Sequence, residues 1–368
     1  MPLINLGQKK MTAWAVGASL DPLCTTALSG LVPSRGPSRA RQAGRRLWIW
    51  LFAAPWLALL VGCGQPPLPP LSVGLNTWVG YDPLVLARDK KLLDPGQVKV
   101  IELSSSSETL RHFRNGLLDA AALTLDETLR LADEGIDVRV VAVLDASNGA
   151  DVVLVDPSIE RLSDLRGAAI AVEQTTVGAL MLQRLLQAAV LEQTDVKVLN
   201  MDATQHLPAL RAQRVSAAVS YEPLAGALRA AGFKEIFDSR QMPGDIVDVL
   251  VVRADLLNTR QDQVVALLAA WQDGLQALLD DTDGAVRLLA LGTDLSPEAY
   301  QSTLKRLSFY APAQSLEQLT GAPPPLGRNA QPLVTTLQTM GLLKRAPDWD
   351  RLVSPEPALR LQALRSPS

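Results

Sequence analysis

The chain has 368 residues, of which 48% are hydrophobic and 20% are charged, and its formal net charge is −3 at pH 7. This length allows two domains of ordinary size, and the small negative charge excludes the basic surface expected of a protein that binds nucleic acid. The chain has only two cysteines, Cys24 and Cys63, and two histidines, His112 and His206. These numbers exclude a disulfide scaffold and a cysteine-based metal site, and they leave little for histidine-dependent catalysis.

The front of the chain has the pattern of an export signal. Five arginines within residues 35–46 precede an apolar run over residues 47–61, which is shorter than a membrane-spanning helix. The run ends in LVGC at residues 60–63, which resembles the lipobox of bacterial lipoproteins, where a peptidase cleaves before a cysteine that carries diacylglycerol. Residues 1–62 are therefore predicted to be a leader with a lipoprotein signal peptide, and Cys63 the lipidated residue that anchors the protein to the membrane. An ordinary secretory signal with a chance cysteine is the alternative.

Residues 63–70 hold the lipidated cysteine and the run PPLPP, which is typical of a stiff extended tether. The stretch LSVGLNTWVGYDPLVLA then covers residues 71–87. It predicts a strand, a loop with Trp78, Gly80 and Tyr81, and a helix whose first amides are capped by Asp82. Loops at the carboxyl ends of strands bind ligands in open α/β sheets, so this loop is a candidate site. The alternative is that both aromatics only fill the top of a core.

Strand–helix units continue along the chain. Ser105 with Glu108 and Thr124 with Glu127 form capping boxes that are typical of helix starts. Strands are predicted at residues 98–103, 120–123, 137–144, 168–172, 196–199, 216–220 and 234–237. Beyond these units the chain is predicted to be helical at residues 259–279, 284–291, 297–307 and 332–340, with a Pro-rich loop at 321–326. Repeated strand–helix units of this length predict parallel sheets covered by helices on both faces.

Two similar α/β sets predict two lobes around a cleft. Strand 151–155 would cross from the first lobe to the second, and the apolar strand 246–252 would return. Hinges of a few extended residues permit closure around a ligand. The predicted divisions are residues 71–150 for the first part of lobe 1, 151–245 for lobe 2, 246–345 for the return strand and helices that complete lobe 1, and 346–368 for a tail. One large doubly wound sheet is the alternative.

Several pieces together carry a family resemblance: NTWVGYDPLVLA (76–87), LDAAALTLDETLRLADEG (118–135), DLRGAAIAVE (164–173) and VSAAVSYEPLAGALRAAG (215–232). In their order and spacing they resemble the solute-binding proteins of ABC importers, in the nitrate/sulfonate/taurine and thiamine-precursor group. The resemblance implies an α/β, two-lobed type II periplasmic-binding-protein fold with a helical C-terminal segment. It also implies an extracytoplasmic protein that passes a small solute to permease and ATPase subunits, with no cofactor, no metal and no catalytic residue.

The resemblance places the ligand-binding residues on loops that face the cleft. They are Trp78, Gly80, Tyr81, Ser105, Ser106, Thr124 and Asp126 in the first lobe, Asp151 at the crossing, and Thr175, Thr176, Tyr221 and Glu222 in the second lobe. Amides at 105–107 and 175–177 favour an anionic or carbonyl oxygen. The aromatics suit a flat ring or a cationic amine, and the acidic side chains suit an amino group.

No Arg or Lys lies in these loops, which counts against a bare sulfonate or nitrate. The sequence therefore favours a small nitrogen-bearing solute, either zwitterionic or an aminopyrimidine, although the family also includes sulfonate binders. Asp126 and Glu222 have an alternative role as charges at helix N-termini. Asp248 is interpreted as a hydrogen-bonding partner at the hinge and not as a ligand contact.

Two other functions stay open at this point. Enzymes resembling chorismate dehydratase and pyrimidine synthase share the fold, and a partner protein of a sensor would bind the same kind of solute. The predicted leader favours an exported protein over a cytoplasmic enzyme. The sequence also has no phosphate-cradling Gly-rich loop, no G-x-S-x-G motif and no metal-ligand cluster.

Overall fold

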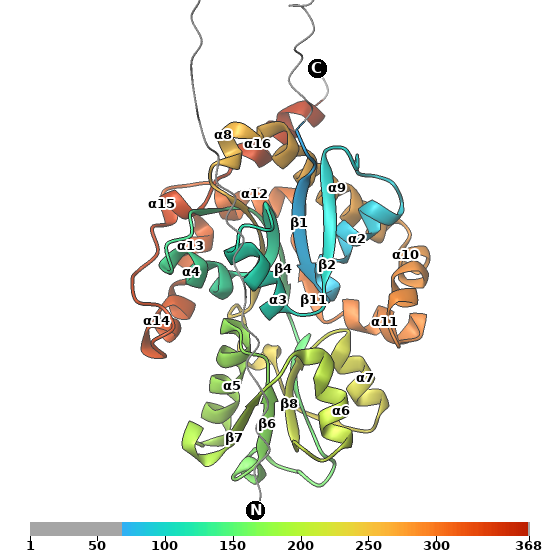
Figure 1. Ribbon diagram of the computed structural model, residues 1–368, viewed down its shortest axis with the longest axis vertical. Helices are drawn as coiled ribbons and strands as arrows, with labels where there is room; N and C mark the ends of the chain where they lie inside the picture. Colours follow the sequence, from blue (N-terminus) through green and yellow to red (C-terminus); the bar gives the residue numbers. More distant parts are fainter. Residues whose placement is uncertain (1–67, 367–368) are drawn as a thin grey trace, which may run out of the picture. The chain divides into compact units, whose positions relative to one another are not determined.

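In the computed structural model, which describes residues 68–366, the chain builds two sheets, each covered by helices (Figure 1). The leader, Cys63 and most of the tether lie outside the described residues, so their predicted roles stay predictions. We call the first sheet and its helices the first lobe, and the second sheet and its helices the second lobe. None of the helices within residues 68–366 is long and apolar enough to span a membrane.

The first sheet has six strands in the order β11-β4-β10-β3-β1-β2. Their bounds are β1 Leu71–Asn76, β2 Val98–Leu103, β3 Ala120–Thr124, β4 Val138–Ser147, β10 Val247–Arg253 and β11 Leu307–Phe309. Strand β1 runs parallel to β2 and β3, whereas β10 runs antiparallel to β3 and β4. Every residue of β3 is buried, as expected for a strand in the interior of a sheet that is covered on both faces.

The second sheet has five strands in the order β7-β6-β8-β5-β9. Their bounds are β5 Asp151–Val155, β6 Ala169–Val172, β7 Lys197–Asn200, β8 Ala217–Tyr221 and β9 Lys234–Asp238. Strand β5 lies in the interior of this sheet and runs antiparallel to β8 and β9. The two predicted crossing strands are therefore interior members of the sheets, since each completes a hydrogen-bonded ladder there. The connections between the lobes are the shorter segments that precede β5 and β10.

These two connections are tied to each other. The Ser239 hydroxyl, in the connection that leads back to the first lobe, lies 2.7 Å from Ser147 Oγ and accepts a hydrogen bond of 2.7 Å from the Gly149 amide. Gly149 has a φ of +101°, which only glycine adopts without strain. Arg306 of the first lobe donates to the Gly149 carbonyl at 2.6 Å and to Glu235 of the second lobe at 3.0 Å. The two connections thus form one small hydrogen-bonded unit, at the place where the sequence predicts a hinge.

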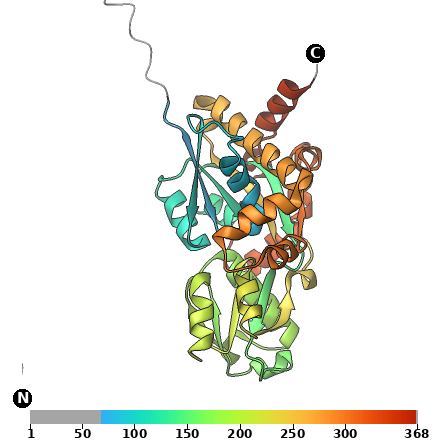
Figure 2. The same cartoon turned by 90° about the vertical axis from the view of Figure 1, so that its right-hand side faces the viewer.

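Most of the C-terminal helices belong to the first lobe, as Figure 2 shows for the orange and red segments. The long helix α9, Gln261–Asp280, packs tightly on α2, Asp82–Asp89, because Gly274 lies against the Pro83 carbonyl, where a Cβ would come within 1.8 Å. The remaining helices are α3 Ser106–Arg114, α4 Leu125–Asp133, α5 Thr176–Ala189, α6 His206–Arg211, α7 Leu224–Ala230, α8 Leu256–Thr259, α10 Thr282–Leu289, α11 Pro297–Leu304, α12 Pro312–Leu319, α13 Pro325–Asn329, α14 Gln331–Thr339, α15 Trp349–Leu352 and α16 Glu356–Arg365.

Three local predictions are wrong. Asp82 is the first residue of α2 and makes no capping bond; its carboxyl accepts a hydrogen bond from the Tyr300 hydroxyl instead. The helix predicted at residues 297–307 ends at Leu304, and its last predicted residue, Leu307, instead begins β11, which pairs with β4 at the edge of the sheet. Helix α13 occupies part of the predicted Pro-rich loop, since Pro325 stands at its first position, where proline is tolerated.

Candidate ligand-binding site

A small cavity lies where loops and strands of the first lobe meet β5, β8 and α5 of the second. It is lined by Asn76, Trp78, Tyr81, Ser106, Thr124, Glu127, Asp151, Val177, Tyr221, Ile246 and Asp248. Its free volume is about 30 Å³, which is room for roughly two water molecules. An organic solute therefore requires the lobes to part or the lining side chains to move.

Six of the predicted site residues line this cavity: Trp78, Tyr81, Ser106, Thr124, Asp151 and Tyr221. The rings of Trp78 and Tyr221 come from opposite lobes and meet edge to face, with centroids 6.0 Å apart and an interplanar angle of 70°. This is a favourable aromatic geometry. A flat solute that enters between the two rings would contact both lobes at once.

The loop that carries Trp78 and Tyr81 is held close to the first sheet. Val79–Tyr81 form a single 3₁₀ turn directly before α2. Within it, a Cβ on Gly80 would lie 2.3 Å from both Asp145 Oδ2 and Trp78 Nε1. Only glycine lets the backbone approach these two groups so closely. Gly80 therefore positions the aromatic side chains and does not itself line the cavity.

Below this loop two carboxyl groups face each other across neighbouring strands. Asp145 of β4 and Asp248 of β10 are register partners, and both side chains are fully buried. The Tyr81 hydroxyl donates to Asp248 Oδ1 at 2.5 Å. Within residues 68–366, both Asp145 oxygens, Asp248 Oδ2 and the Trp78 indole N–H lack a hydrogen-bond partner. Polar atoms buried in this way are costly unless a proton or a ligand satisfies them.

A second group of acids borders the cavity at the start of α4 and of β5. Glu127 accepts hydrogen bonds from the Ser106 hydroxyl at 2.7 Å and from the Thr124 amide at 3.3 Å. The predicted residue Asp126 is fully buried beside Glu127 and does not line the cavity, and neither of its oxygens has a partner in the described part of the chain. Asp151 begins β5, and its Oδ2 is likewise unpartnered there.

Burial makes these acids hold protons near neutral pH. It raises the pKa of Asp145, Asp151 and Glu127 to about 7. It raises the pKa of Asp126 and Asp248 well above the ordinary value, and the neighbouring carboxyls Glu127 and Asp145 add to this. The Trp78 N–H lies close enough to lower the pKa of Asp145 in part, without reaching hydrogen-bonding geometry. An incoming cation would therefore replace protons in this cluster.

The remaining predicted residues lie near the cavity but do not line it. Ser105 and Thr175 cap α3 and α5 by accepting hydrogen bonds from the Glu108 and Gly178 amides. Thr176 is the buried first residue of α5. Glu222 is fully buried, accepts hydrogen bonds from Arg229 and from the Gly226 amide, and lies 3.8 Å from Arg306. Its charge is thus neutralised by arginines and is not offered to the cavity.

Sequence reasoning assigned no ligand contact to Asn76, Glu127, Val177, Ile246 and Asp248, which also line the cavity. The sequence contains a feature that could have identified two of these residues. Asp248 is the one acid within the apolar run IVDVLVV at residues 246–252, where a buried carboxyl requires a reason. Glu127 was interpreted only as part of a capping box, and that box is present; the same side chain also reaches the cavity. Within residues 68–366, no three His, Cys, Asp or Glu residues are arranged to hold a metal ion.

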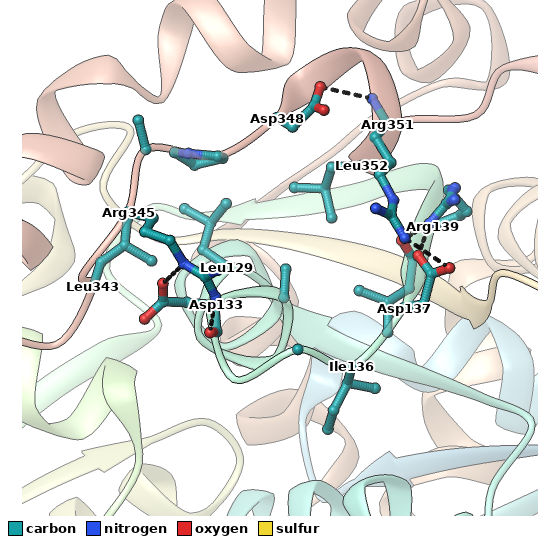
Figure 3. A pocket seen from close by; sticks show the side chains of 15 residues that line it. Leu129, Asp133, Ile136, Asp137, Arg139, Leu343, Arg345, Asp348, Arg351 and Leu352 are labelled. Atoms are coloured by element: carbon teal, nitrogen blue, oxygen red, sulfur yellow. Dashed lines mark hydrogen bonds and ion pairs between the residues drawn. The ribbon is translucent and has the colours of Figure 1, made fainter.

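A larger pocket of about 320 Å³ lies elsewhere on the first lobe, between the end of α4 and residues 343–352 (Figure 3). No predicted site residue lines it. Its charged side chains pair with one another, as Arg345 does with Asp133 at 3.3 Å and Arg351 with Asp137 at 3.0 Å. Asp348 caps α15 by accepting from the Arg351 amide. These charges are thus used within the protein, so the smaller cavity between the lobes is the better candidate.

Known proteins with similar sequences and structures fit this architecture. A relative from Brachyspira hyodysenteriae (strain ATCC 49526 / WA1) is named as an ABC transporter periplasmic binding protein; it is 25% identical over 215 residues, which are 53% of this chain and 62% of the relative. The match thus spans less than two thirds of that relative's length.

Two solved structures show the range of functions that the fold carries. The alkanesulfonate-binding protein SsuA from Xanthomonas axonopodis pv. citri, solved with bound MOPS, is 19% identical with a TM-score of 0.66, over 79% of this chain and 99% of that chain. The desulfurization enzyme DSZB is 18% identical with a TM-score of 0.57, over 80% of this chain and all (100%) of that chain. With the two sheets and the C-terminal helices, these likenesses confirm the predicted two-lobed α/β periplasmic-binding-protein fold.

The family itself is defined by a sequence model. A model described as the NMT1-like family matches residues 64–290, which is more than half of the chain. The match covers the second lobe, the first lobe as far as residue 290, and every residue that lines the cavity. The chain therefore belongs to the NMT1-like family.

Proposed function

We propose that the protein is the solute-binding component of an ABC importer and that its solute is small and carries a basic or N–H-donating nitrogen group. The observation that supports this proposal most strongly is the lining of the cavity between the lobes. Three carboxyl side chains, Glu127, Asp151 and Asp248, line it together with three aromatic rings, Trp78, Tyr81 and Tyr221, and no Arg or Lys is among the lining residues.

The chemistry of this lining selects among solutes. A protonated amine or an aminopyrimidine has N–H donors for the carboxyls and, in the second case, a flat ring for the space between Trp78 and Tyr221. Charge-assisted hydrogen bonds of this kind are about twice as strong as neutral ones, and a cation gains further from aromatic faces. A nitrate or an alkylsulfonate would instead be opposed by these carboxyls whenever they ionise, and it would find no cationic side chain in the lining.

Binding would act by shifting the balance between open and closed lobes. Residues from both lobes line the cavity, so a solute in it is gripped fully only when the lobes are together. A difference of ~1–3 kcal/mol in affinity between the two forms is enough for a functional coupling. The permease would then read the closed form, and the hinge around Gly149 and Ser239 would carry the motion.

A non-catalytic role is part of the proposal. The similar desulfurization enzyme keeps an enzymatic role as the second candidate. The lining holds no histidine or cysteine, and His206 is buried in the second lobe, outside it. We assign the hydroxyl and carboxyl groups of the lining to solute binding. We further propose that permease and ATPase subunits are the partners and that Cys63 carries the lipid that keeps the protein outside the cytoplasmic membrane. A sensor that reads the same closed form would be the alternative partner.

Calorimetric titration of the purified protein tests the proposed solute class. The panel contains an aminopyrimidine, a primary amine, zwitterionic taurine, an alkylsulfonate and nitrate. We expect the tightest binding from an aminopyrimidine or another cationic nitrogen compound, because only these supply donors to the buried carboxyls. Tight binding of nitrate or the alkylsulfonate, with none of the nitrogen bases binding, would contradict the proposal.

A further inference from the structure

We propose that Glu173, a residue of the second lobe, determines the specificity for the solute. It occupies the position at the start of α3 where an anionic group of a solute would bind. Its carboxylate thereby keeps anionic solutes out of the cleft. This inference rests on the proposed solute-binding function and deepens it, because it names a residue of this chain that sets the class of solute.

Three donors converge on the Glu173 carboxylate. The Ser107 amide donates to Oε1 at 2.7 Å, and the Ser107 hydroxyl donates to the same oxygen. The Tyr221 hydroxyl approaches Oε2 at 3.4 Å. Glu173 follows β6 and is only 4% exposed. The carboxylate therefore uses a set of donors, from both lobes, that would suit the oxygens of a sulfonate, nitrate or carboxylate ligand.

The start of α3 explains why an acid is held there. The first amides of a helix lack partners within the helix and carry a partial positive charge, so they attract anions. Ser105 satisfies the Glu108 amide with its own side chain. Glu173 satisfies the Ser107 amide, so two of the first amides of α3 are already bonded to side chains of this protein.

A solute anion could reach these donors only by displacing Glu173. The displaced carboxylate would be left buried without its hydrogen bonds, which is costly. A second acid opposes an anion at the same place, since Asp202 Oδ1 lies 3.5 Å from the Ser107 hydroxyl. The other predicted anion position, at the start of α5, is also engaged, because Thr175 Oγ1 accepts from the Gly178 amide.

The same contact joins the lobes. Ser107 belongs to the first lobe and Glu173 to the second, so their hydrogen bonds form when the lobes meet. In a protein that binds anions, the ligand would supply this negative charge at the helix start. Here the chain supplies it, and the remaining carboxyls that line the cavity are left to meet a cation.

The test compares anion binding by the intact protein with Glu173 unchanged, with Glu173→Ala and with Glu173→Gln. Glu160→Ala is the matched control, since Glu160 is an exposed glutamate of the second lobe. The probes are sodium formate, methanesulfonate and nitrate, measured by calorimetry, with circular dichroism and thermal unfolding as checks of the fold. Formate is included because it has the size and charge of the carboxylate that Glu173→Ala removes.

We expect Glu173→Ala to bind formate and methanesulfonate at least tenfold more tightly than the unchanged protein, and Glu173→Gln to show a smaller gain. The Glu160→Ala control should not differ from the unchanged protein. Folded Glu173→Ala and Glu173→Gln that bind all three anions no better than the unchanged protein would overturn the inference. If Glu173→Ala does not fold, the anion affinities of Glu173→Gln and Glu160→Gln are compared instead, and the same outcome supports or overturns the inference.

Titration of an aminopyrimidine into the same proteins separates this inference from the proposed function. Gain of anion binding in Glu173→Ala, with no nitrogen compound bound by the unchanged protein, would uphold the role of Glu173 and contradict the proposed solute class. Binding of the aminopyrimidine by the unchanged protein, with no gain of anion binding in either variant, would support the proposed solute class and overturn the role of Glu173.

Discussion

Replacing Asp248 with asparagine is expected to weaken binding of the nitrogen-bearing solute by at least about tenfold. Asp248 lies at the base of the cavity, and its Oδ2 has no hydrogen-bond partner in the described residues. A hydrogen bond to a charged group contributes about 1.5–3 kcal/mol, which corresponds to roughly a 10- to 100-fold change in affinity. Calorimetric titration of Asp248→Asn with the tightest binder of the panel measures the loss.

The control for this substitution is Asp294→Asn, which changes an exposed aspartate of the first lobe. It should bind the solute as the unchanged protein does. Asp248→Asn should also remain folded, because it replaces a buried carboxyl, whose pKa burial raises, with a neutral side chain that keeps an oxygen able to accept from the Tyr81 hydroxyl. An unchanged affinity in folded Asp248→Asn would show that this carboxyl does not recognise the solute.

In the absence of added solute, the free energy of unfolding is expected to fall as the pH rises from about 6 to about 8. Burial raises the pKa of Asp145, Asp151 and Glu127 to about 7 in the folded protein, whereas the unfolded chain has ordinary carboxyl pKa values near 4. The folded state thus binds more protons than the unfolded state in this range. Stability is fully present below the unfolded pKa values and is lost as the pH rises through the folded ones.

Urea unfolding at several pH values measures this dependence, and Asp145→Asn sharpens it. The substitution removes a fully buried charge and should stabilise the protein by roughly 2 kcal/mol at pH 8, with a smaller gain at pH 6. Burial lowers the pKa of His206 to about 4, so His206 makes the free energy of unfolding rise with pH. Most of this rise occurs below pH 6. A stability that rises from pH 6 to pH 8, or an Asp145→Asn protein that is less stable at pH 8, would contradict the role of burial.

Saturation with the proposed solute should reverse part of this pH dependence. A bound cation takes the place of a proton beside Asp248 and Asp151, so it stabilises the charged carboxyls. Without a bound cation, the ionised carboxyls of the site lower the free energy of unfolding, and a bound cation compensates them. The same carboxyls would thus influence both the stability of the protein and its choice of solute.

The sequence predicted the architecture well because the fold depends on patterns that repeat. The apolar strands and the capping residues Ser105 and Thr124 determine where helices and strands begin. The structure has both caps and the complete Thr124–Glu127 capping box. The box predicted for Ser105 is only half formed, because Glu108 accepts from the Ser104 amide and hydroxyl instead of the Ser105 amide. Short elements escaped prediction for a physical reason. Strand β11 has three residues, which is too few to show a period, and it exists because it pairs with β4.

The candidate site was predicted in part, because tertiary partners decide what a polar residue does. Glu222 lies between a strand and a helix, where ligand contacts are expected in this fold. In the structure, however, Arg229 and Arg306 neutralise its charge. The amides at residues 105–107 read as a free anion site, and only the fold shows that Glu173 reaches them from the other lobe. The position of Asp248 beside the cavity could not be predicted without the register of β10 against β4, which places Asp248 opposite Asp145.

A crystal structure of the protein with the tightest-binding nitrogen compound tests the central claim most directly. We predict that the solute lies between the lobes, with its ring against Trp78 and Tyr221 and a nitrogen within hydrogen-bonding distance of the Asp151 or Asp248 carboxyl. A solute bound elsewhere, for example in the pocket beside α4, or bound between the lobes with no nitrogen near these carboxyls, would contradict the account.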